Sequence, residues 1–566
     1  MFLTHLLFLI LSSLQLVSAA NRQYQLQLTT SDTTRVDPPD GFPGSRPFIL
    51  TNGLFPGPLI SAQKGDRLLI NVANQITSPR IRRSATIAIH STQHWHGIFQ
   101  QRTSASDGTA EVTQCPISPF QSFEYQFETG QQSGYAYNFP TPLFERCSTS
   151  TSIEPIGTTV ILAHNIVTDL YPKDPHASLY DVDDASTIIT VGDWTHLPAN
   201  EAFANKSILQ PSPDSTLING QGLYMGGPTK TSMIPVIGPV QYGKRYRFRI
   251  INVSCNSFFN ISFDRHPMNV IEADGTEIVP RSVDALTIFP GQRYSVVIEA
   301  NLNPVDPKNP GSYWFRTRPT PDIVNWNPST ADPAVNNAIF RYEGARNAVP
   351  LTTIAPTPTT VLREFDMVPL SNPAPPGGTG LPTKKITVPL RLNGTVWTVG
   401  NGSFFGTPVP VLMQILTGMI PAQQVLGDDN VVTIDYNQTI DLTLTNDCDT
   451  NQNTTPCDIA DNHPIHLHGH EFAVIQAAGQ SKPNYINPPR RDTVAVYNND
   501  VIIRFNTLNP GPWIFHCHID WHLSQGMALV FAEAPNRIIS GPDSVILPPG
   551  WSNLCTIYNK LPPDEQ

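Results

Sequence analysis

The segment GKRYRFRI, residues 243–250, carries the pattern that indicates the fold most clearly. A turn glycine comes first, and basic residues then alternate with Tyr246, Phe248 and Ile250, so that one face of an extended chain is apolar. GDRLLINV at 65–72 and NDVIIRF at 499–505 follow the same design. Although such strands occur in any β-protein, three turn–strand units so far apart predict three related antiparallel β-sandwich domains.

Composition supports an all-β chain with several domains. At about 150 residues per domain, 566 residues predict three or four domains. The 55 prolines disfavour long helices, and the 40% of hydrophobic residues argue against a disordered chain. The net charge of −11 argues against a nucleic-acid partner and against a polybasic membrane anchor.

The first twenty residues, MFLTHLLFLILSSLQLVSAA, have the features of a secretory signal peptide. An apolar run from Leu6 to Leu11 precedes small residues at Ala19 and Ala20, which predicts cleavage before Asn21 and an extracellular protein. The alternative, a membrane anchor, needs about 18 apolar residues, and no run in the chain reaches that length. The N-x-S/T sequons are consistent with a secreted glycoprotein, and they lie at Asn205, Asn252, Asn260, Asn393, Asn401, Asn437 and Asn453.

The cysteines indicate an oxidising compartment. One of the seven, Cys517, lies between two histidines, and the other six form an even set that indicates disulfide bonds. Six cysteines allow about fifteen pairings, although Cys448 and Cys457 are close enough in sequence for a local bridge. The remaining four are Cys115, Cys147, Cys255 and Cys555.

Two changes in composition divide the chain. Residues 350–385 are rich in proline, threonine and glycine, and we expect this linker to join the second domain to the third. A weaker boundary lies near 170–180. The expected division is a signal peptide at 1–20, a first domain at 21–170, a second at 171–349, and a third at 350–566 that includes the linker.

Clustering among the fifteen histidines is the main functional signal. Residues i and i+2 of a strand project to one face, so His94 and His96 of the motif HWHG are expected to project together. The same spacing pairs His466 with His468, while His463 points the other way. An H-x-H pair alone is a weak signal, since two surface histidines explain it equally well.

The segment HCHIDWH, residues 516–522, places two kinds of ligand on one backbone. If it is extended, His516 and His518 face one side and Cys517 faces the other. A thiolate and two imidazoles would then bind different metals, and the short backbone between them would be a path for electrons.

Ligand softness indicates copper. One cysteine thiolate, two histidines and a weak axial thioether form a blue-copper set, which Cys517, His463, His522 and Met527 would supply. The all-imidazole ligands suit a copper cluster. The alternatives are zinc, whose structural sites rarely combine so many histidines with one cysteine, and a core role for Met527.

These motifs resemble those of the multicopper oxidases, specifically the fungal laccases, over almost the whole mature chain. The matching segments are HWHGIFQ (94–100), DGTAEVTQCPISP (107–119), LYDVDDASTIITVGDW (179–194), LINGQG (217–222), GKRYRFRIINVSC (243–255), HPIHLHGHEF (463–472) and HCHIDWH (516–522). The resemblance implies three cupredoxin-like domains, each a Greek-key β-sandwich, in agreement with the three turn–strand units.

The resemblance also implies four copper ions. Type 1 copper would use His463, Cys517 and His522 with Met527 axial, type 2 copper would use His94 and His466, and the type 3 pair would use His96, His468, His516 and His518 with two further histidines.

Two acids and one disulfide follow from the same resemblance. Asp107 and Asp520 match acidic residues that help deliver protons to bound oxygen, although a turn-forming Asp107 and a solvated Asp520 are open alternatives. Cys115 is expected to pair with Cys555.

The implied function is that of a secreted laccase. Such an enzyme oxidises phenolic and related aromatic substrates, as in lignin degradation, by one-electron steps, and it reduces O2 to water with four electrons. Small phenols and O2 are the expected partners, with no nucleic acid and no membrane, and the chain is expected to be a monomer. An axial methionine at 527 favours a modest redox potential. The alternatives are a catalytically impaired copper-binding protein, a ferroxidase and an ascorbate oxidase.

Asn256 is a first departure from the family pattern. An acid that receives the phenolic proton often follows the cysteine at this place, and an amide can form hydrogen bonds but cannot act as a base.

A second departure removes two type 3 histidines. The family motif WYHSHLSTQYCDG should follow Gly134, but the chain continues with YAYNFPTPLFERCSTS. One choice of synonymous codons for IGTTVILAHNIVTD, residues 156–169, encodes that motif in full when it is read from the third base. Our hypothesis is that 135–153 are translated intron and that 154 to about 169 are out of frame, in which case Cys147 is intronic and the restored frame supplies a cysteine for Cys255.

Overall fold

The computed structural model describes fifteen segments of the chain, namely 20–31, 37–44, 48–76, 91–129, 139–140, 163–165, 174–197, 212–224, 231–304, 311–319, 336–350, 357–418, 430–446, 462–497 and 499–561. Four expectations fall outside these residues: the signal peptide up to residue 19, the bridge between Cys448 and Cys457, the fate of Cys147, and nearly all of 135–169.

Strands dominate the structure, and the all-β prediction is confirmed. The N-terminal part forms one four-stranded sheet and two strand pairs. The sheet has the order β2 (Ile49–Thr51), β1 (Asn21–Thr30), β4 (Arg67–Asn74) and β6 (Ser122–Glu128), and the pairs are β3 (Gly57–Ile60) with β8 (Ala163–Asn165) and β5 (Trp95–His96) with β7 (Phe139–Pro140).

Two six-stranded sheets make up the middle part. The first has the order β10 (Ser215–Ile218), β9 (Ile188–Trp194), β12 (Arg245–Asn252), β17 (Arg293–Glu299), β14 (Met268–Ala273) and β15 (Thr276–Val283). The second has the order β11 (Val236–Val240), β19 (Asn337–Tyr342), β18 (Ser312–Pro319), β13 (Phe259–Phe263), β16 (Ala285–Ile288) and β20 (Val361–Leu362). Because β20 belongs to the expected linker 350–385, part of that linker pairs with the middle sheets.

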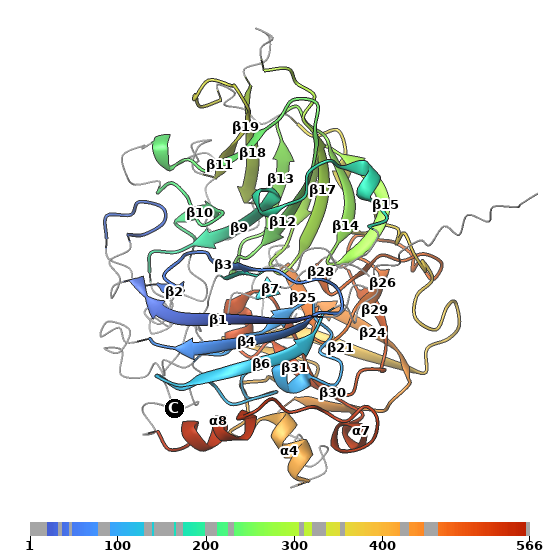
Figure 1. Cartoon of the computed structure of the whole chain (residues 1–566). Helices are drawn as coiled ribbons and strands as arrows, with labels where there is room; N and C mark the ends of the chain where they lie inside the picture. The colour runs from blue at the N-terminus through green and yellow to red at the C-terminus, as the bar shows by residue number, and fades with distance from the viewer. Residues whose placement is uncertain are drawn as a thin grey trace, which may run out of the picture.

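The C-terminal part again has two sheets. One has the order β22 (Val396–Val399), β21 (Lys384–Asn393), β24 (Thr439–Asn446), β29 (Val501–Asn506), β26 (Phe472–Gln476) and β27 (Arg490–Arg491). The other has the order β23 (Val431–Ile434), β31 (Ala528–Glu533), β30 (Gly511–Cys517), β25 (His463–Leu467) and β28 (Thr493–Val496). Figure 1 shows the middle sheets in green above the blue N-terminal strands and the orange and red C-terminal strands.

A parallel pair recurs in all three parts. β1 runs parallel to β4, β9 to β12 and β21 to β24, and each second partner is then followed by an antiparallel neighbour, β6, β17 or β29. The units at 65–72 and 243–250 therefore occupy equivalent places as β4 and β12. The unit at 499–505 does not, since it forms β29, and the equivalent place belongs to β24. A turn followed by an alternating strand recurs throughout a sandwich, so the pattern alone does not identify the topological position.

The burial pattern along β12 also differs from the simple alternation that its sequence predicts. In the N-terminal sheet, β4 alternates buried and partly exposed residues as expected of a half-buried strand. On β12, however, Arg247 and Arg249 are buried with the apolar residues, and their guanidinium groups pair with Glu272 and Asp183. Both faces of β12 are therefore covered, and the charges are tolerated because they are paired.

The C-terminus returns to the N-terminal sheet. Helix α8 (Trp551–Tyr558) lies below β6 in Figure 1, and Trp551 donates a hydrogen bond from Nε1 to the carbonyl of Thr113 at 2.9 Å. Cys555 on α8 forms a disulfide bond with Cys115, as the family resemblance implied. Residues from both ends of the chain share one hydrophobic core, which also includes α4 (Val411–Thr417).

The remaining helices among the described residues are short: α6 (Asp520–Ser524), α7 (Pro535–Ile539), and the 3-10 turns at Ser104–Ser106, Ala177–Leu179, Ala185–Thr187, Thr231–Met233 and Glu364–Asp366. No helix among the described residues is both long and apolar enough to cross a membrane.

Candidate metal centre

One cysteine and two histidines meet inside the C-terminal sheets, and we call them the Cys517 trio. Cys517 ends β30, His463 begins the neighbouring strand β25, and His522 lies on α6. The Cys517 sulfur is 3.8 Å from Nδ1 of His463 and 3.5 Å from Nδ1 of His522, and the two Nδ1 atoms are 3.2 Å apart. All three side chains are buried, so a thiolate and two imidazoles converge in a site shielded from bulk water.

Neighbouring groups enclose the trio. The indole of Trp397 on β22 packs against both imidazoles, with ring centroids 4.7 Å from His463 and 4.9 Å from His522. The backbone N–H of Ile519 donates to the Cys517 sulfur at 3.4 Å, a contact that stabilises a thiolate. Met527 is buried beside the trio, and its backbone N–H and carbonyl bond to His522 and Cys517. Its role as axial ligand stays a prediction.

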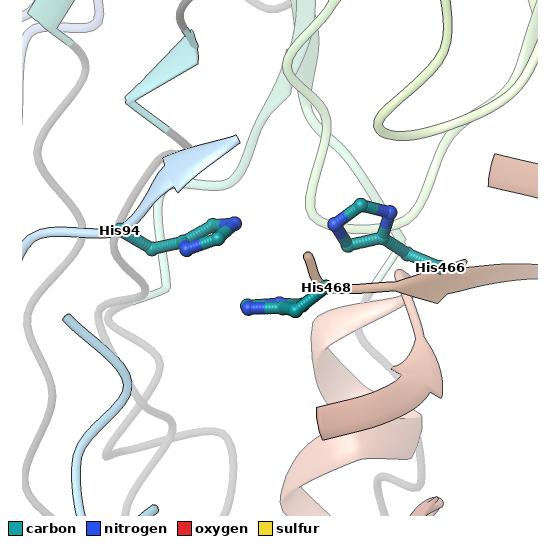
Figure 2. Close-up of side chains that lie close together, drawn as sticks. All are labelled: His94, His466 and His468. Carbon is teal, nitrogen blue, oxygen red and sulfur yellow. The ribbon is translucent and has the colours of Figure 1, made fainter. Parts of the chain in front are cut away.

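Six further histidines form a second buried group, which we call the histidine cluster: His94, His96, His466, His468, His516 and His518. Three of them, His94, His466 and His468, offer ligand atoms within 4.8 Å of one another. Figure 2 shows these rings projecting into one space from two parts of the chain, His94 from the segment before β5 and the other two from β25 and its end.

Strand register completes the cluster. β25 pairs with β30 so that His466 lies opposite His516, while Ile465 lies opposite Cys517. Nε2 of His468 is 3.3 Å from Nε2 of His516, and the rings of His96 and His518 have centroids 5.3 Å apart. The backbone of β30 thus places Cys517 in the trio and its two neighbours in the cluster.

Hydrogen bonds at Nδ1 orient four of the six rings. His94 and His466 contact the main-chain carbonyls of Asp107 and Asp492, each at 2.8 Å. His468 contacts the Asp107 carboxylate at 2.8 Å, and His516 contacts the Cys517 carbonyl at the same distance. A ring anchored at Nδ1 presents Nε2 to a metal, which is the usual arrangement around histidine ligands.

The electrostatics favour metal binding. Burial lowers the pKa of His463 to about 3, and burial together with neighbouring groups brings the pKa of His468 to about 4 and that of His518 to about 3. These imidazoles are therefore neutral at pH 7, the form that binds a metal. Nε2 of His466 is buried with no hydrogen-bond partner among the described residues, a costly state that a metal ion would relieve.

The two predicted acids lie in different places. The buried Asp107 carboxylate lies beside His468 and His94; burial alone would raise its pKa, but the imidazoles hold that pKa well below its ordinary value. Asp520 is buried at the start of α6, its backbone N–H donates to the Cys255 carbonyl at 2.9 Å, and burial raises its pKa well above the ordinary value. Neither residue is a solvated acid, and Asp107 does more than form a turn.

Asn256 lies on the loop that contacts Asp520. Its backbone N–H donates to the Asp193 carboxylate at 3.0 Å, as do those of Cys255 and Ser257 at 2.9 and 2.7 Å. The loop after β12 is therefore fixed beside α6, in agreement with a position near the trio.

Three residues of the site were not predicted from the sequence. Trp397 covers the trio, Asp492 contributes to the cluster, and Arg293 pairs with Asp492. The run Arg490-Arg491-Asp492, in a chain with only 14% charged residues, marks Asp492, whereas no comparable signal marks Trp397 or Arg293.

His470, the last histidine of the motif at 463–470, has a different role. His470 forms a buried ion pair with Glu533 at 2.9 Å and is not part of the cluster.

Known proteins resemble this chain in sequence and in fold. Family profiles described as multicopper oxidase match residues 37–152, 185–345 and 404–537. Laccase-5 of Trametes villosa is 40% identical over 95% of this chain and 93% of its own length, and laccase-1 of Agaricus bisporus is 38% identical over the full length of both. The crystal structure of the laccase from Botrytis aclada superposes with a TM-score of 0.70 at 27% identity, covering 96% of this chain and 93% of that one.

Proposed function

The chain belongs to the multicopper oxidase family, in its fungal laccase group, and from that premise we propose that it oxidises phenols and related aromatic compounds one electron at a time while it reduces O2 to water. One observation carries the proposal: strand β30 connects a cysteine–histidine trio directly to a buried histidine cluster. Laccase chemistry needs these two sites, because one takes single electrons and the other collects four.

The ligand assignment that we propose follows from the family resemblance. The trio would hold type 1 copper with Met527 as a further ligand, His94 and His466 would hold type 2 copper, and His96, His468, His516 and His518 would serve the type 3 pair. Bound copper would supply reversible one-electron redox chemistry at both sites.

The chain links the two sites by short contacts of its own. Cys517 is bonded covalently to His516 and His518, and its carbonyl accepts a hydrogen bond from Nδ1 of His516 at 2.8 Å. Trp397 and the buried walls exclude water from the thiolate. On this proposal an electron that enters near His522 has a path of a few bonds to the cluster.

Proton delivery would use the two acids. Asp107 touches the cluster at His468, and Asp520 lies between the trio and the loop of Cys255. The Asn256 amide can hydrogen-bond a phenol but not take its proton, so we propose that substrate oxidation relies on solvent or on another base.

The chain as written lacks the two histidines that would complete the type 3 pair. We propose that residues 135–153 are translated intron and that 154 to about 169 are out of frame. The segment 156–169 supports this, because one choice of synonymous codons for it encodes a complete WYHSHLSTQYCDG motif in the shifted frame. A cDNA read across the codons for 125–180 tests it, and a transcript that encodes the chain as written would refute it.

We also propose a secreted, monomeric glycoprotein, as the leader sequence and sequons suggest. The sequons at Asn393, the last residue of β21, and at Asn401 and Asn437, which lie in turns, are exposed and suit glycosylation. Asn252 does not, since it is buried and its amide nitrogen bonds to the carbonyls of Ser257 and Ile288 at 2.9 and 3.0 Å.

The test is oxygen uptake by purified, copper-loaded protein made from the sequenced transcript with 2,6-dimethoxyphenol, assayed beside ascorbate and Fe(II). Uptake with the phenol supports the laccase proposal, while a preference for ascorbate or Fe(II) would replace it with one of the other oxidases. A blue absorption band without oxygen uptake would identify a copper-binding protein with an incomplete cluster.

A further inference from the structure

The middle sheets approach the histidine cluster although they supply none of its six histidines. The turn between β16 and β17 is the part of these sheets that contacts the cluster. At Gly291, where φ is +79°, a Cβ atom would lie 2.4 Å from Cδ2 of His518, so the backbone of the turn lies directly against that imidazole.

The same turn holds the C-terminal segment that supports the cluster. Arg293 donates from both terminal nitrogens to the Asp492 carboxylate, at 2.5 and 2.7 Å, and Gln292 donates from its side chain to the Thr493 carbonyl at 3.0 Å. Arg293 and Asp492 are only 2% and 4% exposed, so the pair is desolvated and its fork geometry is specific.

Asp492 faces two histidines of the cluster. Its main-chain carbonyl accepts from Nδ1 of His466 at 2.8 Å, and its carboxylate lies 3.8 Å from that nitrogen and 3.7 Å from Nδ1 of His96. Because Arg293 occupies both carboxylate oxygens, Asp492 is better suited to orienting these rings than to binding a metal itself.

A second ion pair fixes Arg293 in turn. The backbone N–H of Arg293 donates to Oδ1 of Asp274 at 2.8 Å, and the other oxygen of Asp274 accepts from Nε of Arg491 at 2.8 Å. Two arginines and two aspartates thus alternate across the boundary between the middle and C-terminal sheets.

We propose that Arg293, together with Asp492, is a positioning residue of the histidine cluster, so that copper binding there depends on the docking of the middle sheets. The inference rests on the proposed function, since it takes the cluster to be a copper site. If it is correct, replacing the fork of Arg293 by a single ammonium group weakens the cluster and leaves the trio intact.

The test compares Arg293→Lys with Arg504→Lys in the full chain. Arg504 makes the matched control because it forms the same kind of buried two-point pair with Asp441, at 2.5 and 2.9 Å, within the other C-terminal sheet. Each variant keeps its charge and loses the fork. The measurements are a Cu(II) titration, the EPR spectrum of the cluster copper and the blue band of the trio.

We expect Arg293→Lys to lower copper affinity at the cluster about 10–100-fold and to alter the EPR spectrum, with the blue band unchanged, whereas Arg504→Lys keeps all three. Asp492→Asn should act in the same direction. Equal copper binding by the two lysine variants would overturn the proposal, and so would a wild-type chain that binds no copper at the cluster. Failure of the laccase proposal is seen separately, as wild-type protein that binds cluster copper but takes up no oxygen with a phenol.

Discussion

The trio and the histidine cluster are built differently, although they share strand β30. All three members of the trio come from residues 463–522, within one part of the chain. The cluster combines His94 and His96 from the N-terminal part with four histidines of the C-terminal part, and the middle sheets hold Asp492 against it. The trio therefore depends on the folding of one part, and the cluster depends on the docking of three.

The largest expected effect is the loss of one copper site while the other is kept. Cys517→Ser removes the only thiolate of the trio, so we expect the blue band and phenol oxidation to be lost while copper still binds at the cluster. Absorption and EPR spectra of copper-loaded protein measure this. Cys255→Ser is the matched control and should keep the blue band. Loss of copper from both sites in Cys517→Ser would show that the sites do not assemble independently.

The second prediction tests docking through the disulfide. Cys115→Ser breaks the bond that ties the N-terminal part to α8, and we expect a loss of about 2–5 kcal/mol in the free energy of unfolding. Denaturant titration gives that value. Cluster copper should be released at a lower denaturant concentration than the blue band disappears.

The double variant Cys115→Ser/Cys555→Ser serves as the control for this prediction. It should be no less stable than either single variant, because one bond is removed in all three. Simultaneous loss of both copper signals would contradict the difference between the sites.

A smaller effect concerns the trio alone. Met527→Leu conserves volume in a fully buried position and removes the thioether, so the redox potential of the trio should rise. About 59 mV would correspond to a tenfold change in the one-electron equilibrium. Redox titration of the blue band measures it, and cluster spectra should not change. An unchanged potential would argue against axial ligation.

The smallest effect lies at the boundary between the N-terminal and middle parts. Burial and the nearby negative charges of Glu272 and Asp174 raise the pKa of Glu277 to about 7. The positive charge of Lys64, in the N-terminal part, opposes that rise. The unfolded chain ionises near the ordinary value of 4.5, so Glu277 reduces stability as pH rises from about 4.5 to about 7.

Glu277→Gln should remove this dependence, a change of about 1 kcal/mol in the free energy of unfolding. Unfolding measured at pH 5 and pH 8 for both proteins tests it. An equal pH dependence in the variant would contradict the assignment, and the blue band should be the same in both.

The sequence by itself determined the fold class and most of the side chains that meet in the site. Alternation with a period of two placed His516 and His518 on one face and Cys517 on the other, and an extended backbone enforces that geometry whatever surrounds it. The resemblance to a family predicted the disulfide bond between Cys115 and Cys555. Sequence spacing could not predict it, since those residues are 440 positions apart.

Only the tertiary structure decided which remote residues reach these ligands. Trp397 and Arg293 lie in segments whose local pattern is that of ordinary strands and turns, and their roles, like that of Asp492, arise from sheet register and docking. The same holds for β29, whose sequence resembles β4 and β12 but whose place in the sheet is different. Local sequence sets the direction of a side chain relative to its own strand. Which residues that side chain contacts depends on how distant strands pack, and the packing is determined by the free energy of the whole fold.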